Sequence, residues 1–203
     1  MKKHTKKVIF LCLALLAGIV FAYYSRPERF EWGDISSIDL TYYFDCRESN
    51  LMVMYGFAVR WSNPGIETGI EPAQYFSAGI SIRPFGRIND EYVVRVPSQR
   101  ISPEELEPLR RILEEHNTEA WYGFVGSAFP DELNFVYGLN VNLVTGSRFS
   151  ATGSREIPEN FDVVFPLLVD VFMDMAKRYA DDTADFDRVP CIFEIAPFMF
   201  ENP

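Results

Sequence analysis

Histidine is almost absent from this chain: there are two copies in 203 residues, and His4 lies in the basic N-terminal tip. Any Ser-His-Asp or Cys-His catalytic arrangement in the rest of the chain would have to use His116. No nucleophile motif accompanies His116. It falls at the end of an expected helix, in line with apolar residues, where a packing or capping role is expected. The sequence therefore gives no support to nucleophilic catalysis.

Cysteine is also scarce, and no glycine-rich phosphate-binding loop is present. Of three cysteines, Cys12 lies in an apolar leader, and the other two, Cys46 and Cys191, have no zinc-binding spacing around them. In an oxidising exterior these two would form one disulfide or remain separate thiols, and both alternatives are open. Residues 181–187 carry alternating oxygen ligands, but Phe186 stands where a calcium loop needs glycine, so an exposed acidic linker is expected. We expect no metal and no cofactor.

Basic side chains are outnumbered by acidic ones, 19 to 29 over the whole chain. Residues 1–24 hold four lysines and no acid, so the remainder has 15 basic against 29 acidic side chains, a formal charge of −14. Such a surface repels nucleic acid and anionic lipid headgroups. We therefore expect no nucleic-acid partner.

An unbroken apolar segment follows the lysine-rich tip from Val8 to Ala22. Extended to Tyr24 it has 17 residues, which is the short limit for a membrane-spanning helix. Val20-Phe21-Ala22 also suits a signal peptidase, so a retained single-pass anchor and cleavage after Ala22 are both open. In either case the lysines hold the N-terminus in the cytoplasm and the rest of the chain is exported. The protein is then either held in the cell membrane through residues 8–24 or secreted.

The chain is expected to divide into a leader at 1–24, a charged spacer at 25–33 and one extracytoplasmic domain at 34–203. Alternating apolar residues in the first half of the domain predict four antiparallel strands, around 38–44, 51–61, 76–82 and 92–96.

A helix is predicted next, with Ser102 as its N-cap and an end near Asn117. A hairpin over 135–151 and a long apolar helix from Asn160 to Tyr179 complete the domain. Pro166 should bend this last helix or delay its start.

The order ββββαββα predicts an α+β fold, because strands and helices do not alternate as they do in parallel sheets. We expect an antiparallel sheet of about six strands with two helices packed on one face, preceded by the N-terminal hydrophobic helix.

Two loops are candidate binding regions. One contains the aromatic residues Trp121, Tyr122, Phe124 and Phe129, which would grip a sugar or peptide by stacking. The structural alternative is that Trp121 and Phe124 plug one end of the sheet beneath the first helix. The other candidate is the long loop from Ser62 to Gln74.

Several stretches resemble a family of uncharacterised exported proteins, mostly lipoproteins, of Clostridia-like and other gut bacteria. The family order is a helix, N…WxGF, a strand, a turn, I-S-A-x-G, Y-P-x-N-F and a second helix. The matching segments here are 109–117, 121–124, 139–144, 149–153 and 158–161. Ile19 stands where the lipid-bearing cysteine of such a leader would be. The resemblance implies export and an α+β architecture, and it carries no assigned activity.

These patterns together predict a non-catalytic binding or interaction domain of the bacterial envelope. Its partner would be a protein or another envelope component. The alternative is an envelope hydrolase that uses acidic residues which no motif marks.

Overall fold

The computed structural model describes residues 33–46, 51–62, 73–84, 91–126, 135–154 and 156–189. The leader, nearly all of the spacer, Phe129 and Cys191 lie outside these residues. The anchor, the cleavage site and the disulfide between Cys46 and Cys191 therefore stay predictions.

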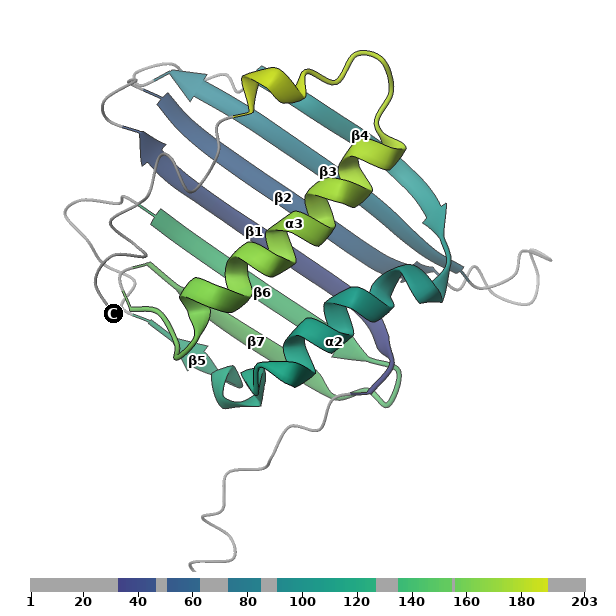
Figure 1. The fold of residues 1–203 in the computed structure, drawn as a ribbon, viewed down its shortest axis with the longest axis vertical. Helices are drawn as coiled ribbons and strands as arrows, with labels where there is room; N and C mark the ends of the chain where they lie inside the picture. Colours follow the sequence, from purple (N-terminus) through teal and green to yellow (C-terminus); the bar gives the residue numbers. More distant parts are fainter. Residues whose placement is uncertain are drawn as a thin grey trace, which may run out of the picture. The chain divides into compact units, whose positions relative to one another are not determined.

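A single sheet of seven strands dominates the described part of the chain, in the order β4-β3-β2-β1-β6-β7-β5 (Figure 1). All neighbouring strands pair antiparallel except β5, which runs parallel to β7. The mixed α+β class is confirmed. The strands are β1 (Ile35–Cys46), β2 (Leu51–Ser62), β3 (Ala73–Pro84), β4 (Glu91–Ile101), β5 (Phe124–Val125), β6 (Phe135–Leu143) and β7 (Arg148–Gly153).

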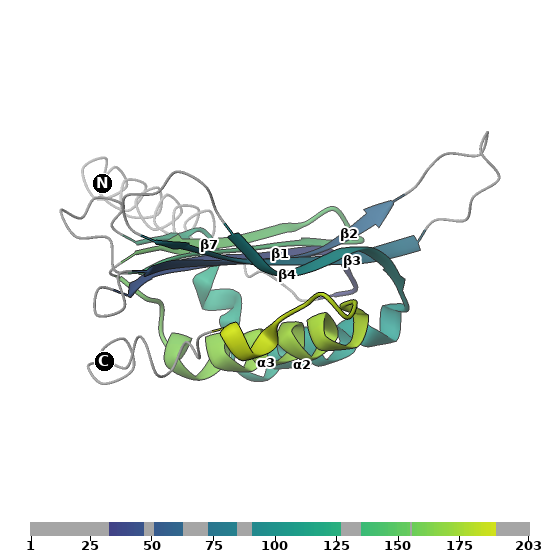
Figure 2. The ribbon, with the colours of Figure 1, turned by 90° about the horizontal axis from the view of Figure 1, so that it is seen from above.

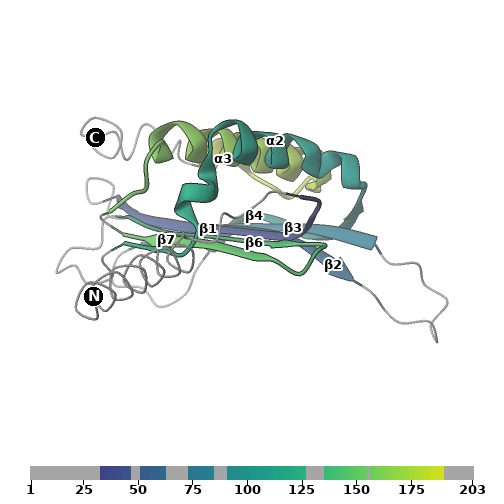
Figure 3. The same cartoon turned by 90° about the horizontal axis from the view of Figure 1, so that it is seen from below.

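The two α-helices among the described residues, α2 (Glu107–Glu115) and α3 (Phe161–Tyr179), lie on the same side of the sheet (Figures 2 and 3). A 3₁₀ turn at Pro103–Leu106 leads into α2. At its start the Glu105 carboxylate accepts a hydrogen bond from the Ser102 N–H at 3.0 Å, as the capping-box pattern predicts. The local sequence thus fixes where the chain leaves the sheet and turns back over it.

The core lies between this helical layer and the sheet. The strand register determines which side chains face it. From Ile38 to Phe44 every second residue of β1 is buried, and Leu40 and Tyr42 stand directly opposite Phe57 and Tyr55 of β2. The rings of Tyr42 and Tyr55 stack with centroids 4.4 Å apart, and Phe165 of α3 meets Tyr42 edge-on at 5.0 Å. A one-residue slip would turn this whole aromatic set to the other face, so the alternation specifies the register.

Strand β4 is longer than predicted, because it continues through Pro97 to Ile101. Its pairing with β3 shifts between Phe76 and Ala78, which leaves an extra residue on β4 next to Pro97. Proline has no N–H to donate, so it is tolerated at a bulge of an edge strand such as β4. The sequence pattern missed this extension because the bulge breaks the alternation.

The start of α3 also differs from expectation. The helix begins at Phe161, so Pro166 inside it does not delay the start. Asn160 precedes the helix as predicted, but its φ is 61° and its side chain caps no N–H. Asparagine tolerates this left-handed conformation, whereas a side-chain N-cap needs an extended one. The backbone carbonyl of Asn160 instead accepts from Val164 at 2.9 Å.

Gly153, at the end of β7, lies where no side chain fits. A Cβ there would be 2.6 Å from the Glu156 carbonyl oxygen and 2.8 Å from the Tyr137 hydroxyl. We expect Gly153→Ala to lower the free energy of unfolding by about 1–3 kcal/mol, because backbone must move to admit the methyl group. Urea denaturation of the purified protein measures this.

Gly56→Ala is the matched control for this substitution, since a Cβ at Gly56 in β2 meets its nearest atom at 3.9 Å. It should not destabilise, because alanine in a strand costs less conformational entropy than glycine. Equal urea midpoints for the two variants would contradict the tight approach at Gly153.

Candidate functional site

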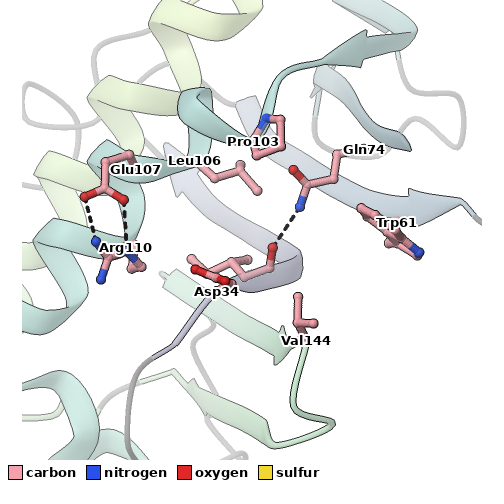
Figure 4. Close-up of a pocket in the computed structure, with 9 residues that line it drawn as sticks. Asp34, Trp61, Gln74, Pro103, Leu106, Glu107, Arg110 and Val144 are labelled. Carbon is pink, nitrogen blue, oxygen red and sulfur yellow. Dashed lines mark hydrogen bonds and ion pairs between the residues drawn. The ribbon is translucent and has the colours of Figure 1, made fainter. Parts of the chain in front are cut away.

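A pocket of about 280 Å³ lies at the end of the sheet where β1 begins and β2 ends (Figure 4). Its walls come from the starts of β1 and β3, the end of β2, the first turns of the α2 region and the residue after β6. Both charged and apolar side chains line it: Asp34, Ile35, Trp61, Gln74, Pro103, Leu106, Glu107, Arg110 and Val144.

Pairing between β2 and β3 brings two of these residues together. Trp61 is the register partner of Gln74, so the two side chains stand side by side on the face of the sheet that the helices cover. Trp61 is 48% exposed, whereas Gln74 is 4% exposed. The two residues that flank the loop predicted as a binding region therefore line this pocket.

The side chain of Gln74 has one hydrogen-bonded group and one hydrogen-bond acceptor that is unpaired. Its Nε2 donates to the Ile35 carbonyl oxygen at 2.7 Å. Only the amide NH₂ can donate to a carbonyl, so this bond fixes which way the amide points. Its Oε1 turns toward Pro103 and Leu106 (Figure 4) and has no hydrogen-bond partner within the described ranges. An unmatched buried acceptor costs about 1–3 kcal/mol, which a ligand donor would recover.

An ion-pair network forms the helical wall of the pocket. Arg110 donates to both carboxylate oxygens of Glu107, at 2.7 and 2.9 Å, and to Glu114 at 2.7 Å. The hydrogen bond from Arg110 lowers the pKa of Glu107, and the same bond raises the pKa of Arg110. Glu107 is therefore ionised at neutral pH and has no proton to give. Asp34 supplies a second, exposed carboxylate at the pocket.

The structure separates the aromatic residues that the sequence grouped as a binding loop. Trp121 is 1% exposed, and its Nε1 donates to the Glu159 carbonyl oxygen at 2.8 Å. Tyr122 is 48% exposed, and Phe124 is half-buried in β5. Phe129 lies outside the described residues. A binding role for these four stays a prediction, with Trp121 placed in the core.

Other candidates do not gather into a site. His116 directly follows α2 and is half-buried. Within the described ranges, no three His, Cys, Asp or Glu side chains lie close enough together to hold a metal ion. Asp181 accepts from the backbone N–H and the hydroxyl of Thr183, so it closes a local turn in the acidic exit from α3. No helix in the described part of the chain has the length and apolar character needed to cross a membrane.

Sequence reasoning named the loop that Trp61 and Gln74 flank, but it missed the other side chains that line the pocket. One signal was available: Gln74 is a polar residue at an inward position of β3, in phase with buried Phe76 and Ile80. A polar side chain in a core-facing phase needs a partner, and that need can be read from the alternation. No comparable sequence signal identifies Asp34, Glu107 and Arg110 as lining residues.

No protein-family model matches this chain, and a search of curated proteins finds no match to it. The resemblance to exported gut-bacterial proteins therefore rests on the quoted motifs alone.

Proposed function

We propose that this protein is a non-catalytic binding domain of the bacterial cell envelope, with its ligand site in the pocket at the end of the sheet. The lysine tip and apolar segment at 1–24 support export, with the segment retained as an anchor helix or cleaved after Ala22. The acidic balance of the remaining residues supports a partner other than nucleic acid.

The observation that carries the binding role is the unpaired acceptor of Gln74 beside a half-exposed Trp61. Small-molecule sites combine apolar walls with a few polar groups whose hydrogen bonds the protein leaves open. Tryptophan is among the residues that most often dominate binding energy. The pocket provides both features in one place.

The alternative, an envelope hydrolase, would need a carboxyl group that acts as an acid, and Glu107 does not suit this role. A pair of carboxylates that cleaves a glycosidic bond needs one member with a raised pKa, so that it can act as the acid. Glu107 has its pKa lowered by Arg110, which is the opposite shift. The unpaired acceptor of Gln74 and the exposed side chain of Trp61 favour binding over hydrolysis.

The test uses purified full-length protein in neutral detergent, exposed to a solubilised envelope fraction of the host, with bound material measured by mass spectrometry. We expect Trp61→Ala to reduce the bound material at least about fivefold, which corresponds to roughly 1 kcal/mol at a binding aromatic. The pocket loses its aromatic wall in this variant, while the fold keeps its core.

Tyr122→Ala is the matched control, because Tyr122 and Trp61 are equally exposed at 48%. It should leave binding unchanged. Loss of binding in Tyr122→Ala alone would move the site to the aromatic loop. Protection of a C-terminal epitope from protease added to spheroplasts would contradict the envelope location.

A further inference from the structure

We propose that the pocket recognises a primary alkylammonium group, carried by a free diamine or by the side chain of a lysine. This deepens the binding function proposed for the same site and depends on it. The group is defined by what the pocket leaves unmatched: one buried acceptor, excess negative charge and apolar walls.

The hydrogen bonds around Gln74 indicate that the ligand group is a hydrogen-bond donor. The free group of Gln74 is its carbonyl oxygen, since its NH₂ is held by the Ile35 carbonyl oxygen. An ammonium group has three N–H donors and no acceptor, so it leaves no acceptor of its own unpaired. Because this oxygen is buried, the ammonium bonds it when the lining of the pocket opens around Gln74. A carboxylate or phosphate would instead place acceptor oxygens against an acceptor.

The charges of the lining residues favour a positively charged ligand. Asp34 and Glu107 bring two negative charges to the pocket, and Arg110 brings one positive charge. Arg110 already donates to two glutamates, Glu107 and Glu114, so it has little capacity left to attract an anion. Ion pairs and hydrogen bonds to a charged donor are stronger than neutral ones, which favours an ammonium over a hydroxyl.

The apolar walls of the pocket favour a ligand whose ammonium group is carried on an alkyl chain. Ile35 and Leu106 are buried, and Trp61 and Val144 present exposed apolar surface at the same pocket. The methylene groups of an alkylamine pack on such surfaces while the charged end reaches polar partners. The face of Trp61 also attracts a cation through its ring quadrupole. A neutral sugar would use the tryptophan face but would gain nothing from the negative charge.

The experiment is isothermal titration of the full-length protein in neutral detergent with four probes. These are 1,5-diaminopentane, the methylamide of Nα-acetyl-lysine, 1-pentanol and N-acetylglucosamine. Both amines should bind at least about tenfold more tightly than 1-pentanol, because a hydrogen bond to a charged donor is worth at least this ratio. Added salt should weaken the amines and leave 1-pentanol unchanged. Tighter binding of the diamine would indicate a free amine as the ligand, and tighter binding of the lysine derivative would indicate a protein partner.

Two variants test the residues named. Gln74→Leu should weaken amine binding about tenfold or more, and Asp34→Asn, at an exposed position, about two- to fivefold. Asp170→Asn on α3 makes the same charge change at an exposed site away from the pocket and should leave the affinity unaltered. Asp34→Asn keeps the test decisive if Gln74→Leu does not fold.

Amines that bind no better than 1-pentanol, or bind equally well to Asp34→Asn and the wild type, would overturn the ammonium assignment. So would preferential binding of N-acetylglucosamine. If envelope material is still captured and is still lost in Trp61→Ala, the ammonium assignment alone has failed. If that capture is also absent, the proposed binding function fails with it.

Discussion

Replacing Phe172 by alanine is expected to lower the free energy of unfolding by about 3–5 kcal/mol, a large share of the roughly 5–15 kcal/mol that keeps a domain folded. Phe172 lies in the middle of α3 with no exposed surface. Its ring stacks on Phe57 of β2 at 5.2 Å and on Phe76 of β3 at 6.5 Å between centroids. Truncation leaves a cavity between helix and sheet that these large rings cannot close.

Guanidinium chloride denaturation of purified protein, followed by circular dichroism, measures the loss. Val163→Ala is the control on the same helix, because Val163 is 46% exposed and alanine is the better helix former. It should change stability by no more than about 0.5 kcal/mol. A Phe172→Ala midpoint close to that of Val163→Ala would mean that α3 is not packed on the sheet as described.

This packing was largely predictable from the sequence. The stripe of Val164, Leu168 and Phe172 at helical spacing requires an apolar partner, and the alternation in β1 and β2 provides a sheet face of the right kind. The capping residues around Ser102 and the hairpin over 135–151 are local signals, so they predict where elements begin and turn. Both were found where the pattern places them.

Nonlocal features were the ones that sequence reasoning missed. Strand β5 has two residues, which is too short for any alternation, and it exists because Phe124 and Val125 pair with Ala151 and Thr152 of β7. The pocket is also a nonlocal feature, because its walls come from segments that are brought together only by the sheet register. Local periodicity gives the faces of each strand but not the side chains that meet at its ends.

Trp121 shows the same limit, because neither its size nor its aromatic neighbours reveal whether it lies on the surface or in the core. The turn at Thr118–Trp121 settles this: Thr118 is buried and donates its hydroxyl to the Leu113 carbonyl oxygen at 2.8 Å. This directs Trp121 inward, where its ring lies 5.7 Å from that of Phe161. The turn after α2 is thereby fastened to the start of α3.

Trp121→Ala is therefore expected to cost about 3–5 kcal/mol in unfolding free energy, through the lost ring and the lost bond to Glu159. Trp121→Phe keeps most of the ring but removes the N–H, so the loss should fall to about 1–3 kcal/mol for the carbonyl left unpaired. Urea denaturation with fluorescence detection measures both. Tyr122→Ala, at a 48% exposed position, should stay within about 0.5 kcal/mol of the wild type. A Trp121→Ala protein as stable as Tyr122→Ala would place this tryptophan on the surface and restore the aromatic loop as the leading binding site.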